Sequence, residues 1–200
     1  MENFIYLASQ SPRRKQLLEQ LGVRHELLLP DTDEDAEALE AVLNNEAPAS
    51  YVKRVTALKL DAAVARLERL KLPLAPVLCA DTTVAMKRVI YGKPENDKDA
   101  VRMLSQLSGT THRVLTAVAV QSGRQRFQAL SASQVRFDSM TAAQIRSYVA
   151  TGECLGKAGA YAIQGRVAQH IGHISGSYSG IMGLPLRETA LLLQSAGIHI

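Results

Sequence analysis

Residues 111–137 read THRVLTAVAVQSGRQRFQALSASQVRF, and this stretch decides the fold class. Two runs rich in β-forming residues, Thr111–Gln121 and Arg126–Phe137, flank a short turn at Gly123. The pattern predicts two long strands joined as an antiparallel hairpin. The rest of the chain alternates strand and helix patterns, which favours helices packed around one sheet. We therefore predict an α/β fold with a mixed central β-sheet flanked by helices.

Shorter strand and helix patterns precede and follow the hairpin. In chain order we expect strands at Phe4–Ala8, His25–Leu29 and Pro76–Ala80, a helix from Pro12 to Leu21, a long helix starting near Pro48, a helix capped by Asp97 and running to about Leu107, a helix starting at a capping box of Thr141 and Gln144, and a last helix between Pro185 and Gly197. On the long helix the predicted apolar face comprises Tyr51, Val55, Leu58, Ala62 and Ala65. A hydrophobic content of 46% in 200 residues suits a single domain over residues 1–200.

The composition argues against several classes of function. The net charge of +4 permits an anionic ligand, but without Trp and with only three Phe and six Tyr we expect no nucleic-acid partner. The chain has no run of ~18 apolar residues and begins MENFIYLAS, so we expect neither a membrane span nor a signal peptide. Cys79 and Cys154 are too few for a disulfide framework or a zinc site. These features predict a cytoplasmic protein.

The segment ASQSPRR leads into the first helix with an unusual charge pattern. Ser11 is a preferred N-cap and Pro12 suits the first helical position, so Arg13 and Arg14 fall in the first turn. Carboxylates are preferred there because the macrodipole is already positive. Two guanidinium groups at this end would instead strengthen a site for a multiply charged anion, with Ser9 and Ser11 as hydroxyl donors. Solvated surface arginines are the alternative.

Carboxylates and lysines elsewhere suit the same chemistry. The run PDTDEDAE places five carboxylates between Asp31 and Glu37, and hard divalent cations use such groups together with phosphate oxygens. Asp81 follows the apolar run PVLCA, and the carboxyl ends of strands carry the sites of open α/β sheets. It could hold a metal ion, accept a proton from water, or do both. Lys59 and Lys93 could contact phosphate as point charges, or be plain surface residues.

Glycine is concentrated late in the chain. Eight of the thirteen glycines lie between Gly152 and Gly183, which predicts unusual backbone angles or close backbone approach. Ala, Tyr, Ile and Leu are interspersed among them, so we interpret this segment as the wall of a ligand cleft. The chain has neither a P-loop pattern nor a GxSxG motif, and the remaining arginines, lysines and carboxylates favour metal-assisted hydrolysis of a phosphoanhydride.

Six short motifs occur in an order and spacing that resemble the Maf family. They are S-x-S-P-R-R after the first strand, P-x-x-x-E, A-D-T at the end of an apolar strand, G-K-P, S-G-x-x-H-x-V and K-A-G-A-Y-x-I-Q-G. Each is weak alone, but together they extend the resemblance from Leu7 to Pro185. The resemblance implies a Maf/ITPase-like fold of two lobes with a cleft between them, and a homodimer.

The resemblance also implies an activity and a set of site residues. Maf proteins are nucleoside triphosphate pyrophosphatases, in which a divalent cation (Mg²⁺ or Mn²⁺) assists attack of water on the triphosphate. The residues expected to contact the substrate phosphates are Ser9, Arg13, Arg14, Lys59 and Lys93. Glu34, four residues after Pro30, is the acid selected from the acidic stretch, and Glu34 and Asp81 are the expected metal ligands. Asp81 is the expected general base.

Three positions resemble the branch of the family that acts on dTTP and UTP. They are Arg13, Thr82 after the key aspartate, and Gln164 in A-I-Q-G. The sister branch, which acts on 7-methyl-GTP, typically carries Gln after that aspartate and Glu in place of Gln164. A carboxamide can pair with a pyrimidine edge that presents both a carbonyl and an N–H, whereas a carboxylate suits the donor edge of guanine.

The sequence therefore predicts a pyrophosphatase for dTTP, UTP and modified pyrimidine nucleotides. Two alternatives stay open. One is the 7-methyl-GTP activity of the sister branch. The other is a non-catalytic regulator of septum formation, against which the joint presence of Glu34, Lys59, Asp81 and Lys93 argues.

Overall fold

The computed structural model describes residues 4–31, 34 and 38–200, to which all structural statements refer. The strands are β1 (Ile5–Leu7), β2 (His25–Leu27), β3 (Val77–Met86), β4 (Val89–Tyr91), β5 (Thr111–Ser122), β6 (Gln125–Phe137) and β7 (Ile171–Ser175). The helices are α1 (Pro12–Gln20), α2 (Pro48–Arg69), α3 (Asp97–Leu107), α4 (Ala142–Val149), α5 (Tyr178–Met182) and α6 (Leu186–Ser195), with short 3-10 helices at Ala38–Glu40, Ala158–Ala160 and Arg166–His170.

The strands form one mixed sheet, as the sequence predicted. Among the described residues the order is β2-β1-β3-β5-β6-β7, with β4 paired to β3. β1 is parallel to β2 and β3, and all other pairs are antiparallel. The hairpin is confirmed: β5 and β6 pair from Thr111 with Arg136 to Ser122 with Gln125, and Gly123 turns the chain with a φ of 57°.

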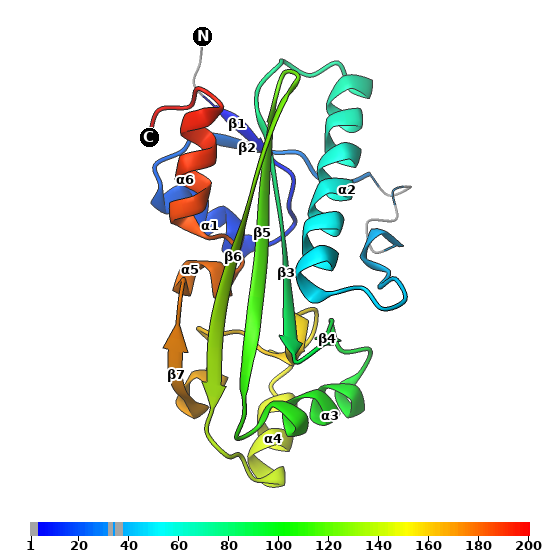
Figure 1. Ribbon diagram of the computed structural model, residues 1–200, viewed down its shortest axis with the longest axis vertical. Helices are drawn as coiled ribbons and strands as arrows, with labels where there is room; N and C mark the ends of the chain where they lie inside the picture. The colour runs from blue at the N-terminus through cyan, green and yellow to red at the C-terminus, as the bar shows by residue number, and fades with distance from the viewer. Residues whose placement is uncertain (1–3, 32–33, 35–37) are drawn as a thin grey trace.

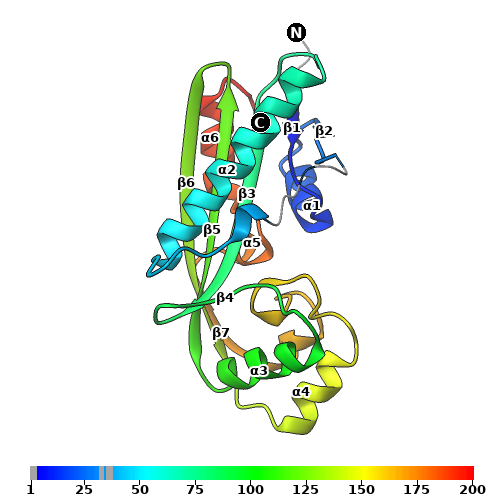
Figure 2. The same cartoon turned by 90° about the vertical axis from the view of Figure 1, so that its right-hand side faces the viewer.

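The long hairpin connects two lobes (Figures 1 and 2). In the upper lobe α2 covers one face of the sheet, and α1 and α6 cover the other. Strand alternation explains this sandwich, because Leu78 packs with α1 and α6 while its neighbours Val77 and Cys79 pack with α2. The lower lobe holds α3, α4 and the chain around Ala158–Ala160, which pack on the far ends of β5 and β6 in a separate core. The two lobes predicted from the resemblance are therefore present.

The helix caps predicted from the sequence were confirmed at two helices and wrong at a third. Ser11 caps α1 by accepting from the backbone N–H of Arg14, and Thr141 forms the predicted capping box with Gln144. The cap of α3 was wrong by one residue, since Asn96 accepts from the N–H of Asp99 and Asp97 is the first helical residue. Asn is as good an N-cap as Asp, so the neighbouring residues compete for this position.

The predicted inner face of α2 was partly wrong. Tyr51 and Val55 are buried, but Leu58 and Ala62 are only half-buried and Ala65 is exposed. The buried face is rotated and comprises Tyr51, Val52, Val55, Thr56, Leu60, Ala63, Arg66 and Leu67. This rotation follows from the packing of α2 across both β3 and β5.

β3 does not end at Asp81, as the sequence analysis expected, but runs on to Met86. The β-forming residues Thr82, Thr83 and Val84 continue the strand, and all pair with β5. Part of the acidic stretch, including Asp33, Asp35 and Glu37, lies outside the described residues. No helix in the described part of the chain is long and apolar enough to cross a membrane.

Candidate active site

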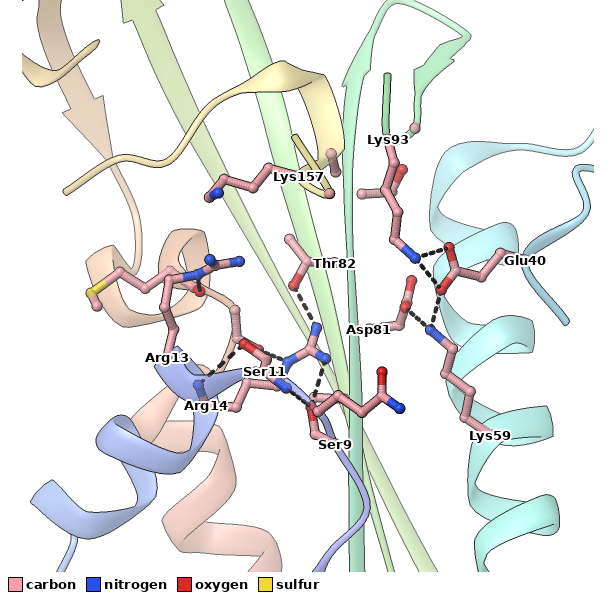
Figure 3. Close-up of a pocket in the computed structure, with 18 of the residues that line it drawn as sticks. Ser9, Ser11, Arg13, Arg14, Glu40, Lys59, Asp81, Thr82, Lys93 and Lys157 are labelled. Atoms are coloured by element: carbon pink, nitrogen blue, oxygen red, sulfur yellow. Dashed lines mark hydrogen bonds and ion pairs between the residues drawn. The ribbon is translucent and has the colours of Figure 1, made fainter. Parts of the chain in front are cut away.

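A pocket of about 620 Å³ opens between the lobes. Its upper wall is the chain from Ala8 to Arg14, one side is α2, its floor is the middle of β3, and its lower wall is glycine-rich chain around residues 156–164. The predicted cleft and its glycine-rich wall are thus both present. All the predicted site residues line this one pocket: Ser9, Arg13, Arg14, Glu34, Lys59, Asp81, Thr82, Lys93 and Gln164. Figure 3 shows most of them converging from different elements.

The two arginines of α1 are held by the end of α5. Arg14 Nε donates to the carbonyl of Gly183 at 2.7 Å, and Arg13 Nε donates to the carbonyl of Met182 at 3.3 Å. Arg14 also donates to Ser9 Oγ at 3.2 Å and to Thr82 Oγ1 at 3.3 Å. The carbonyls at a helix C-terminus carry partial negative charge, which offsets the cations at the N-terminus of α1. Hydrogen bonds within the protein therefore position both side chains at the pocket.

The hydroxyl of Thr82 belongs to a directed chain of hydrogen bonds. Thr116 Oγ1 must donate its one proton to the carbonyl of Gly180, 2.7 Å away. Thr82 must then donate to Thr116 Oγ1 at 2.9 Å, and its lone pair accepts from Arg14. The chain from Arg14 to Gly180 leaves Thr82 no proton for a ligand, so Thr82 orients Arg14.

Asp81 lies at the centre of a cluster of alternating charges. Its Oδ1 accepts from Lys59 Nζ at 2.6 Å, and the same ammonium donates to Glu40 Oε1 at 2.7 Å. Lys93 Nζ lies 3.2 Å from the second oxygen of Glu40 (Figure 3). Asp81 is 7% exposed, and burial raises the pKa of its carboxyl above the usual value, against the opposing effects of Lys59 and Arg14. A buried carboxylate of this kind can accept a proton or hold a cation.

Glu34 lines the same pocket, but its carboxylate is paired with arginines of α2. Arg66 Nε donates to Glu34 Oε1 at 3.0 Å, Arg66 Nη2 pairs with Oε2, and Arg69 also contacts Oε1. These pairs, led by the hydrogen bond from Arg66, hold the pKa of Glu34 at about 2. Arg66 is itself buried and donates to the carbonyl of Leu28 at 2.9 Å. Among the described contacts, none joins Glu34 to Asp81 or to its lysines.

Sequence reasoning missed three charged residues of the pocket: Glu40, Lys157 and Arg66, the partner of Glu34. Glu40 lies three residues after the acidic run from Asp31 to Glu37, and no motif included it. Lys157 points into the pocket from the lower lobe (Figure 3), and it was available as the first residue of the K-A-G-A-Y motif. Burial and the nearby Arg13 lower the pKa of Lys157. Gln164 is an exposed residue of the same lower wall.

Comparison with known proteins finds relatives that match nearly the whole chain. The family model of Maf-like protein matches residues 4–196. A protein of Albidiferax ferrireducens is 69% identical over 200 residues, covering 100% of both chains, and one of Polaromonas sp. is 70% identical, covering 99% of this chain and 98% of its own. One of Cupriavidus metallidurans is 60% identical and covers 100% of both chains. All three carry the name dTTP/UTP pyrophosphatase. A match over nearly the whole length shows that this chain belongs to the family of Maf-like proteins.

Proposed function

We propose that this protein is a nucleoside triphosphate pyrophosphatase that hydrolyses dTTP and UTP to the monophosphate and pyrophosphate. The observation that carries the proposal is a buried carboxylate, Asp81, in a pocket whose lining includes the cations Arg13, Arg14, Lys59, Lys93 and Lys157, besides Arg66, which is paired with Glu34. The names of the full-length relatives support the choice of substrates. Modified pyrimidine nucleotides belong to the same class.

The cations match the charge of a triphosphate. Guanidinium groups can bind phosphate oxygens through two parallel hydrogen bonds, while ammonium groups act as point charges. Arg13 and Arg14 reach the pocket from α1, Lys59 from α2, Lys93 from the turn after β4, and Lys157 from the lower lobe. A triphosphate lying between them would be neutralised from several directions.

Asp81 is suited to activate water in the reaction. The oxygen of the water forms a bond to the α-phosphorus, and the bond from that phosphorus to the oxygen bridging to the β-phosphorus breaks. Pyrophosphate leaves with the bonding electron pair, and Asp81 takes the proton of the water. Lys59, held against Asp81 at 2.6 Å, would stabilise the carboxylate and the developing charge on the phosphates.

The residues present also fit a divalent cation, Mg²⁺ or Mn²⁺. Oxygen donors from one or two carboxylates plus substrate phosphates are the ligands that Mg²⁺ prefers. Asp81 would hold the cation, while Glu34 could join only by loosening its pairs with Arg66 and Arg69. When bound, the ion would supply positive charge to the phosphates. The described residues contain no group of three or more potential ligands, so the substrate itself would complete the set.

Base selection would combine Gln164 with Arg13 and Thr82. Gln164 offers both a donor and an acceptor to a pyrimidine edge. Because the proton of Thr82 is committed to Thr116, Thr82 would act by holding Arg14 and by its size. We further propose that the protein is a cytoplasmic homodimer, forms a single domain over residues 1–200, and has neither a nucleic-acid nor a membrane partner.

The test is the release of pyrophosphate from a nucleotide panel. We expect dTTP and UTP to give the highest initial rates with Mg²⁺ or Mn²⁺ and the rates to vanish with a chelator. A higher rate with 7-methyl-GTP than with dTTP would instead assign the sister activity. If no nucleotide of the panel released pyrophosphate, the result would contradict a pyrophosphatase and favour the non-catalytic regulator of septum formation.

A further inference from the structure

The carboxylate of Glu40 contacts two lysines of the pocket, Lys59 and Lys93. Its Oε1 accepts from Lys59 Nζ at 2.7 Å and from Lys93 Nζ at 3.3 Å, and its Oε2 lies 3.2 Å from Lys93. We propose that Glu40 is a positioning residue that holds both ammonium groups where they bind the phosphates of the substrate. This inference rests on the proposed function for the identity of the substrate.

Glu40 is itself held in place by α2. Its backbone carbonyl accepts from the hydroxyl of Tyr51 at 3.0 Å. The next carbonyl, of Ala41, accepts from Arg54 Nη2 at 2.8 Å, and Arg54 also binds both oxygens of Glu46 at 2.7 Å. Three contacts thus fix the segment from Glu40 to Glu46 on the first turns of α2. The carboxylate of Glu40 is presented by a supported backbone.

The two lysines need such a carboxylate. Lys59 and Lys93 reach toward each other from α2 and from the turn after β4, in a pocket that also contains Arg13 and Arg14. Two ammonium groups that contact the same carboxylate are close enough to repel each other, and lysine side chains are flexible. Without the carboxylate, the two side chains would move apart. A negative group between them offsets the repulsion and restricts both side chains to one arrangement (Figure 3).

Glu40 leaves the lysines able to bind substrate. The ammonium group of Lys59 has three N–H donors, of which Asp81 and Glu40 take two. The third remains for a phosphate oxygen, so substrate can bind without breaking either pair. Glu34 has a different role in the described structure, because its carboxylate is bound by Arg66 and Arg69.

The decisive variant is Glu40→Gln, which keeps the shape and removes the charge. We expect its KM for dTTP and its Kd for inorganic tripolyphosphate, measured by calorimetry, both to rise about tenfold, since charge-assisted hydrogen bonds to two lysines weaken. The value of kcat should change by less than about threefold, because Asp81 still holds Lys59 and Glu40 contacts no reacting atom. The melting temperature should be unchanged, because Tyr51 still holds the backbone of Glu40. Unaltered KM and tripolyphosphate affinity would overturn the proposal.

Two controls separate positioning from other effects. Asp61→Asn removes one exposed carboxylate that pairs with Arg126 and does not line the pocket, so it should behave as wild type. A loss equal to that of Glu40→Gln in this control would mean that net charge alone is responsible, and would refute the role of Glu40. In a Lys59→Met background the tripolyphosphate loss caused by Glu40→Gln should shrink, whereas a loss of undiminished size would also refute it.

These measurements distinguish a failure of the proposed function from a failure of the role of Glu40. If the wild-type protein hydrolyses none of the nucleotides, the pyrophosphatase assignment fails, while the tripolyphosphate affinities still decide the role of Glu40. If the wild type is active and Glu40→Gln equals it in KM and in affinity, only this inference fails.

Discussion

At the scale of residues, the arginines of α1 show how tertiary contacts offset a charge that is unfavourable at the start of a helix. Cations in the first turn of a helix are unfavourable by a few tenths to about 1 kcal/mol. Here Arg13 and Arg14 donate to the carbonyls of Met182 and Gly183, each 169 residues away in the chain. The carbonyls at the end of α5 offset the unfavourable dipole and aim both guanidinium groups at the pocket. The protein's own backbone therefore fixes both guanidinium groups at the pocket.

Asp81 should be required for turnover and dispensable for folding. Replacing it by Asn removes the proton acceptor, and general bases contribute about 10²–10⁴-fold to rates. We expect kcat for dTTP to fall by about this factor in Asp81→Asn, while the circular dichroism spectrum and the melting temperature stay near those of the wild type. Full turnover in this variant would show that another group activates the water.

At the scale of elements, the pocket exists because β1 is short. β1 pairs with β3 only as far as Leu7 with Leu78, whereas β3 continues beside β5 to Met86. Asp81, three residues beyond the end of this pairing, is left without a neighbour on that side, and the turn carrying Ser9 and the arginines enters the gap. The pocket therefore lies at the carboxyl end of β1, as is usual for parallel strands.

The lower wall of the pocket depends on a glycine packed against β3. Gly159 has a φ of +69°, and an added Cβ would lie 2.9 Å from both methyl groups of Val84. Gly152 has a φ of +74°, but a Cβ there would meet nothing within 4 Å. Gly152→Ala should therefore lower the free energy of unfolding only by the cost of a left-handed backbone at alanine, about 1–2 kcal/mol. Gly159→Ala should lower it by a further ~1–3 kcal/mol, because the added methyl group overpacks against Val84.

The measurement for this pair is the free energy of unfolding in urea. We expect Gly159→Ala to be clearly less stable than Gly152→Ala, and its KM for dTTP to rise as the wall shifts. Equal losses in the two variants would show that Val84 moves aside without resistance.

At the scale of the whole molecule, the hairpin of β5 and β6 is the frame that relates the lobes. Both strands run through the two lobes, so the walls of the pocket are held at a set distance (Figures 1 and 2). Chain from Ala8 to Gly183 contributes to one pocket. Stability of the frame and geometry of the site are therefore linked.

His112 makes the stability of this frame depend on pH. It is 1% exposed on β5, its Nε2 lies 2.8 Å from the hydroxyl of Tyr161, and burial lowers its pKa from 6.5 to about 4. The unfolded chain binds the proton more readily than the folded protein. The stabilisation is therefore complete above about pH 6.5 and is lost as the pH falls toward 4, with a total on the order of 3 kcal/mol.

Urea unfolding at about pH 7.5 and about pH 4.5 measures this loss. His112→Gln keeps a hydrogen-bonding group toward Tyr161 and cannot titrate, so its loss of stability between the two pH values should be smaller than that of the wild type. Carboxylates titrate in both proteins and cancel in the comparison. Identical losses would show that His112 is not the group responsible.

Much of the fold and the site could be predicted because the signals were local. The β5–β6 hairpin, the Ser11 cap of α1 and the capping box of Thr141 depend on residues close together in the chain. The motifs likewise identified residues that all line one pocket. The rotated inner face of α2 and the continuation of β3 past Asp81 could not be predicted, because both depend on which strands pack beside them.

The sequence by itself determined the fold class of this protein, an α/β fold with a mixed sheet. It also determined the chemical groups: two arginines at a helix start, and an aspartate and lysines within motifs of the Maf family. Only the tertiary structure decided which carboxylate each cation meets. Glu34 pairs with Arg66 on α2, and Glu40 lies between Lys59 and Lys93, although the two acids are only six residues apart in the chain. Charge and propensity are properties of single residues and their near neighbours, whereas ion pairing within about 3 Å requires elements distant in the chain to pack together.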